Sequence, residues 1–283
     1  MAKHYEALQR AEAERRRKAV GEPAVMAPTE WDTTPASAPV RKRGSLKKIL
    51  SFGSGRRDKI AVETANDINK RRITMLQPDS VVSEQFRTLR GRIDSLATQQ
   101  SLKTVSVVSA NSGEGKSMAS INLAVVTSMS LGKKVLLVDC DLRNPSIHTS
   151  LGVDPAVGLG EVLTGSARLE EAITKIDTVN MDVLFVRGRP TNPSELLASV
   201  GMREMVEEVA ELYDQVILDT PACLGLPDAK TVSELSDGIV LVVRAGVTPK
   251  EDVETMLEIL DQRRILGMVL NGVAQNSSPT GPY

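Results

Sequence analysis

A glycine-rich segment combines the residue types that bind phosphate groups. Residues 110–117 read ANSGEGKS and lie between an apolar run and a helical stretch. They fit the phosphate-loop pattern G-x-x-x-x-G-K-[ST], with alanine in place of the first glycine. In such a loop, backbone N–H groups and a helix N-terminus converge on an oligophosphate, the lysine reaches the terminal phosphates, and the hydroxyl ligates Mg²⁺. The pattern therefore predicts a nucleotide site built from Asn111, Ser112, Gly113, Glu114, Gly115, Lys116, Ser117 and Met118.

Three carboxylates follow two other apolar runs. Asp139 and Asp141 lie in LLVDCDLRNP, and Asp219 lies in VILDTPA. Side chains two apart on an extended segment point the same way, so we expect Asp139 and Asp141 to face one site. Phosphoryl transfer needs mainly positioning and charge neutralisation, for which a lysine, Mg²⁺ and two or three carboxylates nearly suffice. The three aspartates are therefore candidate catalytic residues beside Lys116.

The elements that position these residues are short apolar runs alternating with helical stretches. Buried strands are predicted at 104–109, 134–139, 182–186, 215–219, 238–243 and 267–271. Helices are predicted at 117–131, 201–213 and 249–262, and after Pro78 helical spacing relates Phe86, Leu89, Ile93 and Leu96. Near-continuous apolar strands alternating with helices are typical of a parallel sheet covered on both faces. The predicted fold class is therefore α/β, a P-loop NTPase with a mostly parallel, doubly wound sheet whose carboxyl edge binds ligands.

Composition excludes several classes of protein. The 283 residues are 41% hydrophobic and 25% charged, which excludes fibrous, collagen-like and wholly disordered chains. The two cysteines, Cys140 and Cys223, form no C-x-x-C pair and histidines are few, which argues against a disulfide framework or a zinc site. No window approaches the ~18 consecutive apolar residues of a membrane-spanning helix, and the N-terminus lacks a secretory signal. We therefore expect a cytoplasmic protein.

The chain divides into four predicted parts: a short N-terminal helix at 1–18, a flexible Pro-rich and then basic linker at 19–60, the phosphate-loop domain at 61–272, and a flexible tail at 273–283. The first 60 residues carry a net charge of +7 and the remainder −8. Within the linker, the basic segment 41–59 is predicted to bind the anionic inner face of the cell membrane, since each Lys or Arg contributes ~1 kcal/mol there. Attraction to nucleic acid and a merely solvated linker are the alternatives, and no specific nucleic-acid binding is expected.

Several ordered motifs resemble one family, the bacterial tyrosine kinases of capsule and exopolysaccharide synthesis, of the CpsD/CapB autokinase type. Residues 78–272 resemble its catalytic domain: SANSGEGKS matches the Walker A motif, LLVDCDLRNP matches Walker A′ and VILDTPA matches Walker B. Further similar stretches are EQFRTLR, GLGEVLTG, NPSELLAS, DGIVLVVRAGVT and GMVLNGV. The resemblance implies an ATP-dependent protein-tyrosine autokinase that regulates capsular or exopolysaccharide synthesis or export.

The resemblance also implies roles for individual residues. Lys116 would bind the β and γ phosphates of ATP, and Asp139 would orient or deprotonate the attacking tyrosine hydroxyl. Mg²⁺ would be held by Ser117, Asp141 and Asp219.

The E-x-x-R-x-x-R element, here Glu84, Arg87 and Arg90, is in the family an oligomerisation surface that builds a ring. Its spacing places the three side chains on adjacent turns of one helix. Carboxylate–guanidinium pairing across subunits is feasible there, and a solvated helix face with internal pairs is the alternative. We therefore expect a homo-oligomer.

The phosphate acceptor expected from the resemblance is a C-terminal tyrosine that a neighbouring subunit phosphorylates. Of Tyr5, Tyr213 and Tyr283, only Tyr283 lies in a suitable tail, and Tyr213 is expected to pack. The last 11 residues could extend ~36 Å, at ~3.3 Å per residue, and reach a neighbour's active site. Family members usually carry a cluster of tail tyrosines, so a single acceptor departs from the family's pattern.

The resemblance also implies a partner that activates the kinase. In the family, the kinase is switched on by the cytoplasmic tail of a membrane chain-length regulator, which we expect here to be a separate polypeptide. The alternative function is a P-loop ATPase or nucleotide-dependent adaptor of a membrane polysaccharide complex, without kinase activity. A ParA/MinD-type positioning ATPase is less favoured, because Asn111 stands where that type carries a signature lysine.

Overall fold

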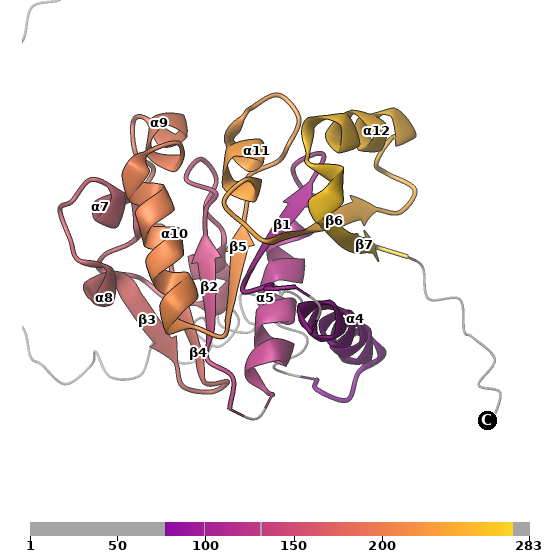
Figure 1. The fold of residues 1–283 in the computed structure, drawn as a ribbon, viewed down its shortest axis with the longest axis horizontal. Coiled ribbons are helices and arrows are strands. Elements are labelled where there is room, and N and C mark those ends of the chain that lie inside the picture. Colours follow the sequence, from indigo (N-terminus) through magenta and orange to yellow (C-terminus); the bar gives the residue numbers. More distant parts are fainter. Residues whose placement is uncertain (1–76, 99, 131, 274–283) are drawn as a thin grey trace, which may run out of the picture. The chain divides into compact units, whose positions relative to one another are not determined.

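A seven-stranded sheet lies at the centre of the computed structural model (Figure 1). The structure describes residues 77–98, 100–130 and 132–273. All of them belong to one compact unit, Gly53–Tyr283. The strand order is β3-β4-β2-β5-β1-β6-β7, and every neighbouring pair is parallel except β3 and β4. The strands are β1 Thr104–Ser109, β2 Val135–Asp139, β3 Ile173–Ile176, β4 Met181–Leu184, β5 Gln215–Asp219, β6 Gly238–Arg244 and β7 Ile265–Asn271. The phosphate loop follows β1, and the other two motifs end β2 and β5, so all three meet at the carboxyl edge.

Helices cover both faces of this sheet (Figure 1). One face packs against α4 Val81–Ala97 and α5 Lys116–Ser128. The other face packs against α9 Pro193–Leu197, α10 Val200–Leu212, α11 Asp228–Ser233 and α12 Lys250–Ile259. Along the chain, β2 is followed by three short helices before β3: α6 Ile147–Leu151, α7 Leu159–Leu163 and α8 Leu169–Ala172.

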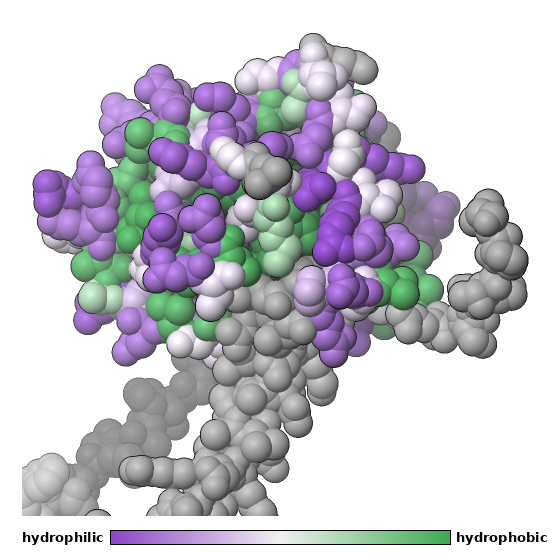
Figure 2. Space-filling view, turned by 90° about the horizontal axis from the view of Figure 1, so that it is seen from below, coloured by the Kyte–Doolittle hydropathy of each residue, from purple (hydrophilic) through white to green (hydrophobic). Residues whose placement is uncertain are grey.

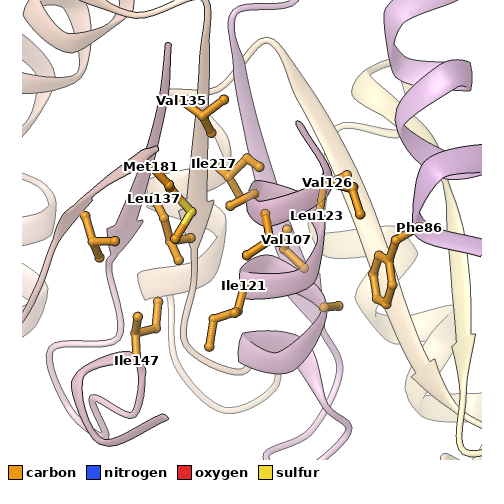
Figure 3. Close-up of a cluster of buried hydrophobic side chains, with 14 of the residues drawn as sticks. Phe86, Val107, Ile121, Leu123, Val126, Val135, Leu137, Ile147, Met181 and Ile217 are labelled. Atoms are coloured by element: carbon orange, nitrogen blue, oxygen red, sulfur yellow. The ribbon is translucent and has the colours of Figure 1, made fainter. Parts of the chain in front are cut away.

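The core under α5 fixes the direction of the helix that carries the phosphate-loop lysine. Val107, Leu137 and Ile217, from three neighbouring strands, gather with Leu123 of α5 in one cluster (Figure 3). All four side chains are buried, and full burial of each such side chain contributes roughly 1.5–3 kcal/mol. Nearly every residue of α5 is buried, so its N-terminus is held at the carboxyl edge of the sheet.

The fold class predicted from the sequence is confirmed, and each predicted strand is present within two residues of its expected bounds. The helix expected at 117–131 ends at Ser128, and the one expected at 249–262 ends at Ile259 and is followed by the 3-10 turn η1 Gln262–Arg264. The antiparallel edge strand β3 was not predicted, because its four residues carry too short a pattern. For the same reason α6, α7, α8, α9 and α11, each of four to six residues, were not predicted.

Figure 2 views the molecule from below, toward the amino ends of the strands, where hydrophilic and hydrophobic side chains form small mixed areas. A cavity of about 400 Å³ opens at this end of the sheet and is lined by residues that include Arg203, Asp237 and Arg264. No candidate catalytic residue lines it. Within the described ranges, no helix is both long and apolar enough to cross a membrane. The helix expected at 1–18, the linker expected at 19–60 and tail residues 274–283 lie outside those ranges.

Candidate active site

The phosphate loop, called the P-loop below, spans residues 110–117 and needs glycine at two positions. Gly113 and Gly115 have φ angles of 82° and 95°, a left-handed conformation that costs other L-residues roughly 1–2 kcal/mol. At Gly115, the N-cap of α5, a β-carbon would also overlap the Asn271 side chain. Ala110 is different: in the described part of the chain, the one non-glycine residue with positive φ is Asn180. Alanine is therefore compatible with the backbone at position 110.

Side chains from the C-terminal part of the chain hold the P-loop main chain. Arg244, at the end of β6, donates from a guanidinium nitrogen to the Gly113 carbonyl oxygen at 3.3 Å. Asn271, at the end of β7, donates from Nδ2 to the Glu114 carbonyl oxygen at 2.8 Å. Both carbonyl groups thus accept hydrogen bonds from the β6–β7 side of the loop. This arrangement leaves the backbone N–H groups of the P-loop to bind an anion.

Two P-loop side chains are also engaged on that side. Thr248 donates from Oγ1 to Glu114 Oε1 at 2.5 Å, and Asn111 donates from Nδ2 to Asp252 Oδ2 at 2.6 Å. Glu114 is only 3% exposed, and its other carboxylate oxygen has no hydrogen-bond partner among the described residues. The four contacting residues, which we call the P-loop brace, are Arg244, Thr248, Asp252 and Asn271.

Lys116 and Asp219 form a buried ion pair at the start of α5 and the end of β5. Lys116 Nζ lies 3.0 Å from Asp219 Oδ1 and 3.4 Å from Ser117 Oγ. Ser120, one turn further along α5, donates from Oγ to the same Asp219 oxygen at 2.9 Å. Asp219 Oδ2 is buried and has no hydrogen-bond partner in the part of the chain that the structure describes. The sequence analysis did not identify Ser120 as a site residue. It lies four residues after Lys116, a spacing that places the two side chains on the same face of a helix.

Asp139 lies beside Asp219 in the sheet, where the register pairs the two residues. It has no exposed surface, and its two carboxylate oxygens accept hydrogen bonds from the backbone N–H groups of Asp141 (3.1 Å) and Ile147 (3.3 Å). Burial, and next the negative charge of Asp219, raise the pKa of Asp139 to about 8. The positive charge of Lys116 acts in the opposite direction.

Asp141 lies in the segment that leaves β2, residues 140–147, which we call the A′ segment. Its Oδ1 accepts a hydrogen bond from the Asn144 backbone N–H at 2.9 Å. Burial raises the pKa of Asp141, and Lys116 opposes the shift. The structure therefore brings Asp139, Asp141 and Asp219 together around the charge of Lys116.

The donor set fits Mg²⁺ better than a metal held entirely by protein. Within the described ranges, no group of three or more His, Cys, Asp or Glu side chains is arranged to hold a metal ion. Mg²⁺ usually keeps several waters and binds one or two carboxylates together with substrate phosphates. The unpartnered Asp219 oxygen, which lies near the Lys116–Ser117 pair, is the kind of acceptor that a hydrated cation would satisfy.

The E-x-x-R-x-x-R residues lie on α4 as predicted, but they differ in their contacts. Arg87 pairs with Glu84 on the exposed side of the helix. Arg90 instead donates to the Val126 carbonyl oxygen of α5 at 2.8 Å, and its Nε lies 3.7 Å from Asp94. Arg90 therefore attaches α4 to α5 within the subunit.

The other candidate residues are the tyrosines, the two cysteines and the basic segment. Tyr213 packs as predicted, and its hydroxyl donates to Asp182 at 2.8 Å. Cys140 and Cys223 are both buried, and burial raises the pKa of both thiols, to about 11 for Cys223. The proposed acceptor Tyr283 and the basic segment 41–59 lie outside the described residues.

Comparison with known proteins agrees with this geometry. The family model described as an AAA domain matches residues 102–265. The tyrosine-protein kinase YwqD of Bacillus subtilis is 41% identical over 202 residues, which cover 71% of this chain and 85% of YwqD. The succinoglycan biosynthesis transport protein ExoP of Rhizobium meliloti is 32% identical over 231 residues, 80% of this chain but only 29% of ExoP.

A solved structure shows the same relationship. The kinase domain of the Escherichia coli tyrosine kinase ETK superposes with a TM-score of 0.69 at 31% identity, over 75% of this chain and 84% of that domain. The P-loop and its surrounding sheet make the chain a nucleotide-binding protein. By sequence and by fold, the chain belongs to the bacterial tyrosine-protein kinases.

Proposed function

We propose that this chain transfers the γ-phosphate of Mg-ATP to tyrosine and acts on its own C-terminal Tyr283. The observation that supports this most strongly is the cluster of Lys116, Asp139, Asp141 and Asp219 at the carboxyl edge of the sheet. One buried lysine and three carboxylates supply the positioning and charge that phosphoryl transfer needs.

The P-loop would bind the phosphates through its backbone. Residues 112–117 would present N–H groups, whereas the side chains of Asn111 and Glu114 serve the P-loop brace. Lys116 Nζ would exchange its contact with Asp219 for the terminal phosphates, while Ser120 keeps Asp219 in place. Mg²⁺ would be held by Ser117, Asp141 and Asp219 and would neutralise charge on the phosphates.

Asp139 has an orienting role in this proposal. It is fully buried, and both of its oxygens accept backbone N–H groups, including that of Asp141. It would therefore hold the A′ segment against the end of β2. A strong base is not required, because phosphoryl transfer depends mainly on positioning.

Assembly and regulation are further parts of the proposal. Glu84 and Arg87 have exposed surface on α4 and would pair across subunits in a homo-oligomer, which would bring Tyr283 to a neighbour's site. The basic segment 41–59 would hold the kinase at the anionic inner face of the membrane. There the cytoplasmic tail of a separate chain-length regulator would activate it. ExoP, a succinoglycan transport protein, supports a role in capsular or exopolysaccharide synthesis or export.

The acceptor and its direction are tested by mixing two full-length variants. One carries Lys116→Met and keeps Tyr283, and the other carries Tyr283→Phe and keeps the catalytic lysine. After incubation with Mg-ATP and a regulator's cytoplasmic tail, peptide-mapped mass spectrometry should find phosphate on Tyr283 of the Lys116→Met chain.

Each outcome has a distinct meaning. Phosphate on Tyr283 in wild type but not in the mixture would contradict transfer between subunits. Phosphate confined to other residues would remove Tyr283 as the acceptor and leave the kinase activity. Tyr213→Phe is the matched control. Because the Tyr213 hydroxyl is bonded to Asp182 within the fold, its removal should leave phosphorylation of Tyr283 unchanged.

A further inference from the structure

A closed triangle of hydrogen bonds lies beside the A′ segment. The Nε atom of Arg143 donates to Asp228 Oδ2 at 2.7 Å, and a terminal guanidinium nitrogen of Arg143 donates to Ser194 Oγ at 2.7 Å. Ser194 in turn donates to Asp228 Oδ1 at 2.6 Å. Both Asp228 oxygens and the Ser194 hydroxyl are thus used within the triangle.

Each corner of the triangle follows a different strand of the sheet. Arg143 lies in the A′ segment after β2, Ser194 lies in α9 after β4, and Asp228 begins α11 after β5. The Asp228 side chain has no exposed surface, whereas that of Arg143 is 33% exposed. Burial of an aspartate requires a partner of opposite charge, which Arg143 supplies. The triangle therefore holds three connections together at the carboxyl edge.

The triangle is linked to Asp141 through the main chain. The backbone N–H of Asn144, the residue after Arg143, donates to Asp141 Oδ1 at 2.9 Å. On the other side, the Asp141 N–H donates to Asp139. The orientation of Asp141 thus depends on where the backbone at 143–144 lies, and the Arg143 side chain anchors that backbone to α9 and α11.

We propose that Arg143, Ser194 and Asp228 form a clamp that positions Asp141 for the metal-bound nucleotide. The clamp acts through Asp141, so it should set how much Mg²⁺ tightens nucleotide binding, and it should leave the metal-free contacts with the P-loop unchanged. This inference rests on the proposed function, in which Asp141 contributes to the Mg²⁺ site.

The test compares nucleotide affinity with and without Mg²⁺ in the full-length protein. A fluorescent ATP analogue is titrated in excess Mg²⁺ and in EDTA. The Kd in EDTA divided by the Kd in Mg²⁺ measures how much the metal tightens nucleotide binding. Ser194→Ala and Arg143→Lys should each reduce this ratio about tenfold, as for other groups that orient metal ligands, with the Kd in EDTA changed less than twofold. Arg168→Lys is the matched control and should leave the ratio unchanged. Arg168 pairs with Glu171 at a comparable distance of 2.8 Å, but both side chains are far more exposed than those of the clamp.

The outcomes separate the clamp from the proposed function and from a merely structural role. An unchanged ratio in both variants, with wild type showing tighter binding in Mg²⁺, overturns the clamp alone. Equal weakening in Mg²⁺ and in EDTA, accompanied by a lower Tm, also overturns it, because that is the signature of general destabilisation. A wild-type protein whose nucleotide affinity ignores Mg²⁺ removes the proposed Mg²⁺ site and the clamp together.

Discussion

The P-loop and the A′ segment follow β1 and β2, which flank β5 in the sheet, and they are held in different ways. The P-loop is contacted by the four side chains of the brace, two of which bond its main-chain carbonyl groups. The A′ segment is held differently. Asp139 accepts hydrogen bonds from the backbone N–H groups near both of its ends, those of Asp141 and Ile147, and the clamp of Arg143, Ser194 and Asp228 holds its middle.

This difference indicates where each region is sensitive to substitution. Contacts to main-chain atoms are kept when loop side chains change, so the P-loop depends mainly on its glycine backbone and on Lys116. The A′ segment depends on a few buried or half-buried side chains, each of which bonds several partners. A single change there should therefore disturb more of the segment.

The largest effect is expected from Gly115→Ala, with Gly113→Ala as its matched control. Both positions require a positive φ, which predicts a loss of about tenfold in nucleotide affinity, but only at Gly115 would the β-carbon also overlap Asn271. Gly115→Ala should therefore lose more affinity in calorimetry than Gly113→Ala, because the Asn271 side chain must also move and give up its hydrogen bond to the Glu114 carbonyl oxygen. Adding Asn271→Ala should return affinity toward that of Gly113→Ala, and equal losses in the two single variants would contradict the role given to Asn271.

A large loss of stability is expected when the clamp's positive charge is removed. Arg143→Met leaves the buried Asp228 without its ion-pair partner, which should lower the free energy of unfolding by about 3 kcal/mol, the lower end of the range for such pairs because the Arg143 side chain is 33% exposed. Urea denaturation measures this loss. The control Arg168→Met breaks an exposed pair and should leave the midpoint unchanged. Comparable midpoints in the two variants would show that the A′ segment does not depend on the clamp.

The buried Asp139 should give stability a pH dependence of known sign. Its pKa is raised from 3.8 to about 8, so the native state keeps a proton that the unfolded chain releases. The contribution of Asp139 to stability therefore falls as pH rises from about 4 to about 8. Asp139→Asn removes this slope, so the stability of the variant relative to wild type should rise between pH 5 and pH 8. The measurement is urea denaturation without nucleotide or Mg²⁺, and parallel pH profiles would contradict it.

The smallest effect is expected within the P-loop brace. Thr248→Val removes the hydrogen bond to the buried Glu114 and the one that Thr248 accepts from the Arg244 backbone N–H, which together should cost about 2 kcal/mol of stability. Nucleotide affinity should fall less than tenfold, because Arg244, Asp252 and Asn271 still hold the loop. Calorimetry would refute this redundancy if Thr248→Val lost as much affinity as Gly115→Ala.

Much of the fold could be predicted because its signals are local. The strands that carry Asp139 and Asp219 are near-continuous apolar runs, and the P-loop has a fixed spacing between β1 and α5. Short elements such as β3 and α9 were missed because periodicity needs more residues than they contain.

The contacts that complete the site could not be predicted, because they join residues distant in the sequence. Neither Asn271 against Gly115 nor Asp228 against Arg143 leaves a pattern in either segment, since the pairing follows from strand order alone. Arg90 was predicted with Glu84 and Arg87 from its spacing, yet spacing does not show that its side chain bonds α5. Because Arg90 bonds α5, the proposed pairing across subunits is assigned to Glu84 and Arg87.

In the proposed function, the cluster around Lys116 transfers phosphate to tyrosine. The most direct test is intact and peptide-mapped mass spectrometry of full-length wild type and Lys116→Met after Mg-ATP treatment, with and without a regulator's cytoplasmic tail. We expect phosphotyrosine in wild type that is lost with Lys116→Met. ATP hydrolysis by wild type with no residue modified, even with an activating tail present, would contradict it and favour a nucleotide-dependent adaptor.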